Sequence, residues 1–186
     1  MLRSLSSRSP FAFALLAIAV AALAADSNVD VQKSKITATF KQEGVPVEAP
    51  FQKFTGRIVY DPKNVSAATA MLDVDTGSFD IGDEAYNAEV RKQEWFDSNT
   101  FPKASFRSTA IKPGAPGKFD AVGTLSVKGK TQSITVPINV QAITGGSAFD
   151  GSFVISRKTF GIGSAAWDDV LDDKVTVRFH LVSTGQ

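Results

Sequence analysis

The sequence predicts an all-β protein of about eight antiparallel strands, and three observations lead to that fold class. Apolar and polar residues alternate between positions 35 and 183, in segments of roughly six to twelve residues. Gly, Pro, Asn or Asp separates these segments, as is typical of turns between strands. Nearly every segment has one apolar and one polar face, which argues against a parallel sheet buried on both sides. A closed barrel and a two-sheet sandwich both fit this pattern.

The clearest alternation runs from Phe119 to Lys128, and it resumes at Ile134 after a turn at Gly129. In chain order, the predicted strands are residues 36–40, 54–60, 70–76, 104–111, 119–128, 134–140, 149–157 and 175–182.

Glycines on the apolar face favour a barrel over a sandwich. Gly56, Gly123 and Gly151 each occupy an inward position, where a missing side chain lets the strand bend or admits a close neighbour. Pro137 cannot donate a ladder hydrogen bond, so its strand is expected to have an edge or a bulge there.

One segment breaks the β pattern. Residues 83–94 ("DEAYNAEVRKQE") are rich in helix formers, with acidic residues in the first turn and Arg91 and Lys92 near the end. This charge order suits the helix dipole. We therefore expect one short helix, followed by a loop, between two strands.

The amino terminus has the pattern of a secretory signal peptide. Arg3 and Arg8 precede an uncharged apolar run at residues 11–23, and Ala-Leu-Ala follows before the first acid, Asp26. We expect cleavage after Ala24, giving a signal peptide at residues 1–24 and a single barrel domain at residues 25–186. The mature chain would carry 18 basic and 19 acidic side chains and no cysteine. These features predict a soluble periplasmic protein without nucleic-acid affinity.

The usual catalytic and metal-binding groups are scarce. The chain has no cysteine and a single histidine, His180, so a Ser–His or Cys–His pair and a zinc site are both disfavoured. We expect no metal, no cofactor and no catalytic residue. Carboxylates do cluster, which leaves an enzyme acting on envelope glycans or lipids as an alternative; the clustered residues are Asp80, Asp83, Glu84, Asp168, Asp169, Asp172 and Asp173.

An irregular segment after the predicted helix is rich in aromatics. Trp95, Phe96 and Phe101 lie in a proline-bearing loop placed where it can cover one mouth of a barrel. They fit either a fixed plug or a mobile lid that touches a ligand. Phe106 re-enters the strand pattern and is expected in the lumen wall.

Five stretches together resemble the YceI-like, polyisoprenoid-binding family. They are "DTGSFDIG" (75–82), "WFDSNTFPKASFRST" (95–109), "GTLSVKGKTQSITVPI" (123–138), "RKTFGIG" (157–163) and "DDKVTVRFHL" (172–181). The resemblance implies an extended eight-stranded antiparallel barrel of lipocalin-like shape. It further implies an apolar lumen that holds a long isoprenoid or similar amphiphile, with no catalysis.

On this basis we expect a non-catalytic periplasmic carrier that sequesters or transports a polyprenyl phosphate or quinone-like lipid. The candidate lumen and lid residues are Phe40, Phe54, Ile58, Leu72, Val90, Trp95, Phe96, Phe101, Phe106, Leu125, Phe153, Ile155, Phe160, Trp167 and Phe179. The candidate head-group residues are Arg91, Lys92 and Arg157. The sequence leaves open a homodimer, transient membrane contact and a third reading, a stress-response interaction module whose barrel is filled by its own side chains.

Overall fold

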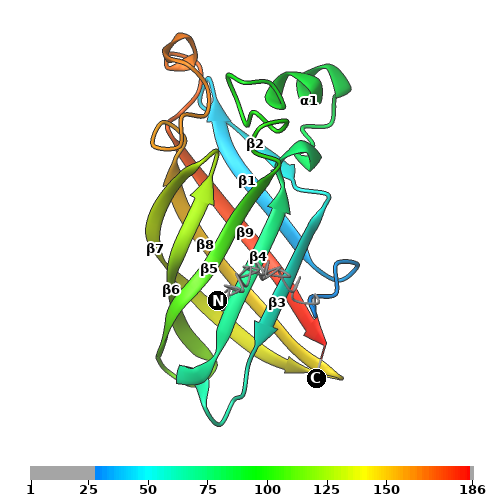
Figure 1. Cartoon of the computed structure of the whole chain (residues 1–186), viewed down its shortest axis with the longest axis vertical. Helices are drawn as coiled ribbons and strands as arrows, with labels where there is room; N and C mark the ends of the chain where they lie inside the picture. The colour runs from blue at the N-terminus through cyan, green and yellow to red at the C-terminus, as the bar shows by residue number, and fades with distance from the viewer. Residues whose placement is uncertain (1–27, 185–186) are drawn as a thin grey trace, which may run out of the picture.

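The protein is a curled, nine-stranded antiparallel sheet with one short α-helix. The structure is a computed structural model and describes residues 28–184, so the predicted signal peptide lies outside the described residues. The strands are β1 (Lys35–Gln42), β2 (Val45–Pro50), β3 (Phe54–Val59), β4 (Thr69–Asp75), β5 (Lys103–Pro113), β6 (Lys118–Val127), β7 (Lys130–Ile143), β8 (Gly146–Ser156) and β9 (Lys174–Thr184). Their order in the sheet is β2-β1-β9-β8-β7-β6-β5-β4-β3 (Figure 1).

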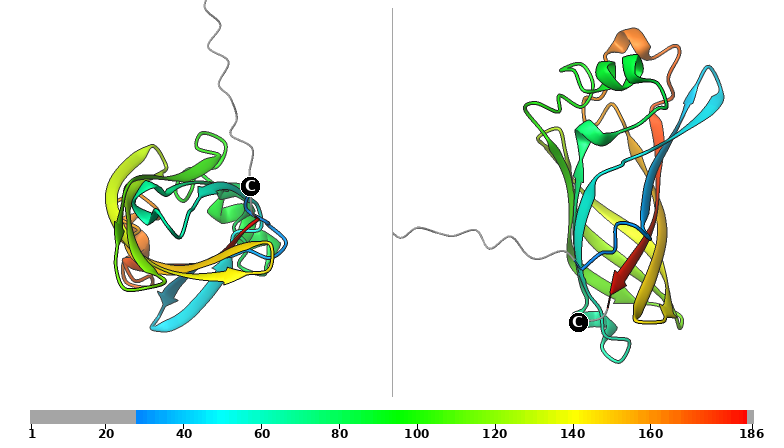
Figure 2. Two further views of the ribbon diagram at one scale, coloured as in Figure 1. Left: turned by 90° about the horizontal axis from the view of Figure 1, so that it is seen from below. Right: turned by 90° about the vertical axis from the view of Figure 1, so that its right-hand side faces the viewer.

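The sheet curls into an elongated barrel because its two edge strands are consecutive in the chain. β2 pairs with β1 and β3 pairs with β4, and only residues 51–53 separate β2 from β3. One bent stretch of chain therefore contributes a strand to each edge of the sheet. Seen end on, the strands surround a common axis (Figure 2).

The wall between β3 and β9 is completed by the first described residues. Asn28 donates its backbone N–H to the Gly56 oxygen in β3 (3.0 Å) and accepts from the Thr184 N–H in β9 (3.1 Å). Its side-chain amide bonds both the oxygen and the N–H of Ile58, at 2.7 and 2.8 Å. Asn28 thus satisfies backbone groups that would otherwise be left at a sheet edge.

Eight of the nine strands correspond to the predicted segments, and the additional strand is β2. Its sequence, Val-Pro-Val-Glu-Ala-Pro, carries Pro46 and Pro50, which reduce its resemblance to a strand. β2 tolerates both prolines because it pairs on one side only, with β1.

The predicted helix is present but shorter than expected. α1 (Glu84–Val90) is capped by Asp83, whose carboxylate accepts from the N–H groups of Ala85 and Tyr86 at 2.8 and 3.2 Å. The chain then turns back, because the Phe96 N–H donates to the Val90 oxygen at 3.0 Å. Three 3₁₀ turns complete the elements, η1 (Val65–Ala67), η2 (Thr76–Ser78) and η3 (Ala165–Trp167).

The inward glycines admit close neighbours, as predicted: Leu72 and Val29 approach Gly56, and aromatic rings approach Gly123 and Gly151. A Cβ built on Gly123 would lie 2.5 Å from the Phe106 ring, and one built on Gly151 would lie 2.4 Å from the Phe179 ring. Both rings can therefore lie against the wall instead of filling the lumen.

Pro137 lies where two strands separate. The β7–β8 ladder ends at the Ile138–Gly151 pair, so Pro137 is one residue beyond it and costs that ladder no hydrogen bond. Above this point a separate core cluster forms around Phe160, which is 0% exposed and packs with Leu125 and Val127.

Candidate functional site

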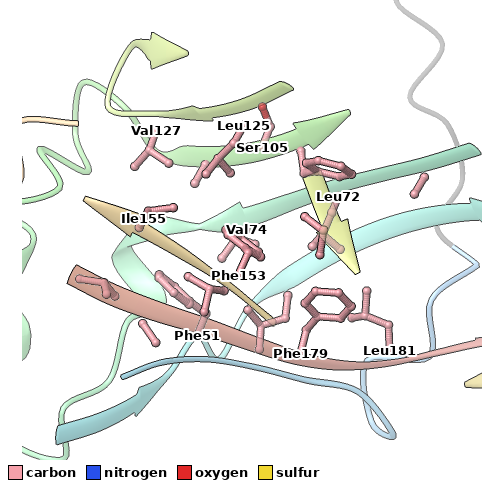
Figure 3. A pocket seen from close by; sticks show the side chains of 18 of the residues that line it. Phe51, Leu72, Val74, Ser105, Leu125, Val127, Phe153, Ile155, Phe179 and Leu181 are labelled. Carbon is pink, nitrogen blue, oxygen red and sulfur yellow. The ribbon is translucent and has the colours of Figure 1, made fainter. Parts of the chain in front are cut away.

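The barrel encloses a cavity of about 220 Å³ whose wall is almost entirely apolar. Side chains from every strand except β2 reach it, and Leu72, Val74, Phe153 and Phe179 lie around the same space (Figure 3). Alternation produces this wall, since every second residue of a strand faces the same side. The cavity volume shows that the inward side chains do not fill the lumen.

An aromatic cluster lies at the cavity end remote from α1. The Tyr60 ring meets the Phe149 ring edge-on, with centroids 5.4 Å apart, and stacks with the Phe119 ring at 6.1 Å. All three residues line the cavity. They form an apolar floor.

A second aromatic cluster lies beneath α1. The Phe79 ring is 4.8 Å from the Phe51 ring and 5.4 Å from the Phe96 ring, measured between centroids. These residues also line the cavity. Aromatic groups therefore line both ends of the cavity.

Two chain segments cover the α1 end, residues 83–101 with α1 and residues 158–171 with η3, and we call them the lid segments (Figures 1 and 2). The Trp95 and Trp167 rings, one from each segment, lie 5.2 Å apart. The Glu94 carboxylate accepts from the Trp167 indole N–H at 3.1 Å and from the Ser164 hydroxyl. The Ser164 hydrogen bond lowers the pKa of Glu94. Glu94 thus joins the two lid segments as a carboxylate.

Lys128 fastens the lid segments to the barrel wall. It occupies a two-residue turn with Gly129, and both residues have positive φ (48° and 72°), as in the type I′ turns of hairpins. Its ammonium donates to the carbonyl oxygens of Gln93 (2.7 Å), Glu94 (3.3 Å) and Gly161 (2.7 Å). Partial burial lowers the pKa of Lys128.

Arg157 is buried at the cavity wall and bound to the second lid segment. Its side chain is 4% exposed and forms an ion pair with Asp168 at 2.8 Å. The guanidinium also donates to the backbone oxygens of Ile162 (3.1 Å), Leu171 (3.0 Å) and Asp172 (3.2 Å). Four protein acceptors therefore hold Arg157 in place.

The structure brings eleven of the fifteen predicted lumen and lid residues to the cavity. These are Phe40, Ile58, Leu72, Val90, Trp95, Phe96, Phe106, Leu125, Phe153, Ile155 and Phe179. Their role in binding a ligand stays a prediction.

Four predicted residues lie outside the cavity lining. Phe54 is part of the wall core, and Phe160 is buried in the cluster above Pro137. Phe101 packs against the turn, 2.8 Å from where a Gly129 Cβ would lie. Trp167 lies behind Trp95. Of the three head-group candidates, Arg157 lines the cavity, whereas Arg91 and Lys92 do not.

Sequence reasoning missed several lining residues. Phe119 and Phe149 stand on the apolar faces of predicted strands, so alternation alone could have identified them. Phe51 and Phe79 lie in irregular chain, where no periodicity indicates which side chains face inward.

Two members of the acidic clusters, Asp80 and Asp168, have pKa shifts in the direction opposite to that of a general acid. A hydrogen bond from the Asn87 side chain lowers the pKa of Asp80, and one from Lys158 lowers the pKa of Asp168. A catalytic acid needs the opposite shift. Within residues 28–184, no group of three His, Asp or Glu side chains could hold a metal ion. No helix in the same range is long and apolar enough to cross a membrane.

An antiparallel barrel around an apolar cavity defines the fold class of lipocalin-like barrels. The chain belongs to the family of YceI-like domains, because the family model matches residues 28–183. This confirms the resemblance that the five sequence stretches predicted.

The chain is similar to several known proteins. A UPF0312 protein of Vibrio cholerae is 29% identical over 171 residues, covering 84% of this chain and 89% of its own. The crystal structure of Burkholderia cenocepacia BcnA is 40% identical with a TM-score of 0.81, covering 84% of this chain and 99% of BcnA.

A second solved structure shares the fold at lower identity. It is described as a polyisoprenoid binding domain from Saccharophagus degradans implicated in plant cell wall breakdown. It is 18% identical with a TM-score of 0.70, covering 84% of this chain and 97% of that one.

Proposed function

We propose that the protein binds an isoprenoid amphiphile in its barrel cavity and carries it through the periplasm. The observation that carries the proposal is the barrel cavity of about 220 Å³ with its almost wholly apolar wall. Burying a lipid tail gains about 0.8 kcal/mol per CH₂, so such a wall would supply most of the affinity. The polyisoprenoid binding described for the Saccharophagus degradans domain, which has the same fold, supports this ligand class.

A periplasmic carrier requires export, and the leader supports that part of the proposal. Residues 1–24 combine two arginines, an apolar run and a small-residue end. Amino-terminal sequencing of protein recovered from the periplasm is expected to begin at Ala25. Recovery of the protein only in the cytoplasm with its leader intact would overturn this part.

Binding is tested by extracting periplasmic protein with solvent, identifying the extracted lipid by mass spectrometry, and adding polyprenyl lipid to the emptied protein. Two neighbouring residues of β8 provide a matched pair. Ile155 lines the cavity, whereas Val154 is 56% exposed. Ile155→Trp should reduce lipid uptake because the larger side chain occupies lumen space, and Val154→Trp should leave uptake unchanged. Equal uptake by both folded variants, or no uptake by the wild type, would contradict the proposal.

A further inference from the structure

The barrel wall is interrupted between β7 and β8. Their ladder stops at the Ile138–Gly151 pair. Beyond that pair, toward the lid segments, β7 pairs with β6 alone and β8 pairs with β9 alone. We call the interval between residues 131–137 of β7 and residues 152–156 of β8 the seam. No ladder joins the two strands along the seam.

Pro137 accounts for this interruption. Hydrogen-bonded pairs alternate along an antiparallel ladder, and the two-residue turn at 144–145 places them at Ile143, Gln141 and Asn139 of β7. Pro137 is the next position in this series, and it has no N–H to donate. The ladder therefore ends at this residue and leaves the two strands free to diverge.

The other interruption of the sheet, between its edge strands β2 and β3, is closed by backbone bonds. The Asp80 N–H donates to the Pro50 oxygen and the Gln52 N–H donates to the Ser78 oxygen, both at 3.0 Å. Within residues 28–184, no ladder pair and no bond from a loop backbone crosses the seam. Local opening is easiest where backbone hydrogen bonds are few, so the seam is the weakest part of the wall.

Apolar side chains close the seam instead. Phe160 is 0% exposed and forms a cluster with Leu125 and Val127 of β6, against which Ile134 of β7 and Ile155 of β8 pack. Leu125, Val127 and Ile155 line the cavity, whereas Phe160 and Ile134 do not (Figure 3). Phe160 therefore lies behind the cavity lining, between the diverging strands.

Phe160 belongs to the second lid segment, which few contacts hold across the seam. The oxygen of its neighbour Gly161 accepts from the Lys128 ammonium at 2.7 Å, and the Gly163 N–H donates to the Glu94 oxygen of the first lid segment at 2.9 Å. Among the described residues, no loop backbone bond joins residues 158–163 to β7. A displacement of this segment would withdraw Phe160 without breaking a ladder of the barrel.

We propose that the lipid enters and leaves the cavity sideways, through the seam, and that Phe160 is the plug that opens and closes this route. The inference rests on the proposed function. It puts the passage in the side wall of the barrel, away from the mouth that α1 and Trp95 cover.

The first test separates a gate from a residue that holds the ligand. Binding and release of cis-parinaric acid, a fluorescent fatty acid, are followed by stopped flow. Because Phe160 lies outside the cavity lining, we expect Phe160→Ala to raise both rates several-fold and to change Kd by less than about twofold. Phe54→Ala is the matched control, because it removes a second buried ring that lies outside the lining. It should change neither rate.

The second test leaves the core side chains in place. The chain has no cysteine, so Thr135→Cys with Val154→Cys puts two exposed thiols on opposite sides of the seam. The shortest bis-maleimide that joins them should slow both rates several-fold relative to the same variant before reaction. The control is Asn139→Cys with Asp150→Cys, a pair inside the ladder, whose cross-link should change neither rate.

The outcomes separate this inference from the proposed function. If Phe160→Ala exchanges the fatty acid at the wild-type rate, or if the seam cross-link leaves exchange unchanged, the seam is not the route. If Phe54→Ala speeds exchange as much as Phe160→Ala does, the barrel has loosened generally and the plug role is wrong. If the wild type binds neither cis-parinaric acid nor hexaprenol, the proposed function itself fails.

Discussion

The ring of Phe106 in β5 lies so close to Gly123 in β6 that a Cβ on the glycine would be 2.5 Å from the ring and 2.5 Å from the Arg107 carbonyl oxygen. Gly123→Ala therefore forces both neighbours to move. Overpacking of this kind lowers the free energy of unfolding by about 1–3 kcal/mol, which urea denaturation would measure. Adding Phe106→Leu should restore part of the loss, because only the Arg107 contact then remains. If Gly123→Ala is as stable as the wild type, Phe106 and Arg107 can move aside without a measurable cost, and the overpacking argument is wrong.

The two lid aromatics Trp95 and Phe101 should behave differently. Trp95 is buried and lines the cavity, so Trp95→Ala is expected to cost about 3–5 kcal/mol, like a core truncation. Phe101 is half-buried and lies outside the cavity lining, so Phe101→Ala should cost about 1–2 kcal/mol and leave lipid exchange unchanged. Phe149→Ala provides the core-truncation reference, because Phe149 is 3% exposed. Faster lipid exchange in Phe101→Ala would contradict this expectation and would indicate that Phe101 is part of a mobile lid.

Arg157→Lys is expected to lower the free energy of unfolding by about 2–4 kcal/mol, because an ammonium cannot reproduce the four donations that the guanidinium fork makes. Lys158→Met is the matched control. Lys158 shares the Asp168 carboxylate at 2.8 Å but is about half exposed, so its loss should cost about 0–1 kcal/mol. Similar stability of the two variants in urea would contradict a structural role for Arg157.

Asp168 should make stability depend on acid pH. Hydrogen bonds from Lys158 and Arg157 lower its pKa in the folded protein, while the unfolded chain keeps the ordinary value of about 4. Its contribution is therefore fully present above about pH 4 and is lost as pH falls through the folded pKa. Asp168→Asn should be less stable than wild type at neutral pH, and this difference should shrink below about pH 4. The same pH profile in the control Asp169→Asn would show that the effect is not specific to Asp168.

Alternation predicted most of the barrel because inward residues such as Leu72 and Phe153 follow the strand period of two. It could not find β2, whose prolines are tolerated only because the strand lies at an edge. Nor could it separate Phe160, which fills a satellite core, from residues that face open space. Whether an apolar residue fills the separate cluster or faces the cavity depends on where β7 and β8 stop pairing, and this position is a property of the whole sheet.

The polar part of the site was less predictable still. Arg157 looked like a head-group ligand because a basic residue near an apolar lumen suits a phosphate. Its acceptors come from residues 162–172, which fold back onto it. Such pairing is set by tertiary contacts between loops, for which a single sequence carries no periodic signal.

Lys128 should control how firmly the lid segments stay on the barrel. Its ammonium donates to three carbonyl oxygens, which come from both segments. In Lys128→Met these oxygens lose that donor and must be hydrated by water instead. Because they lie near the surface, we expect the free energy of unfolding to fall by only about 1–3 kcal/mol.

The larger effect of Lys128→Met should be on lid opening, which needs only local separation. Loss of a pre-bound fluorescent fatty acid to excess vesicles, followed by stopped flow, should become several-fold faster in this variant. Lys118→Met is the control, because Lys118 lies at the opposite end of β6 and is exposed. If both variants release the probe at the wild-type rate, the Lys128 contacts do not limit opening and the ligand leaves by another route.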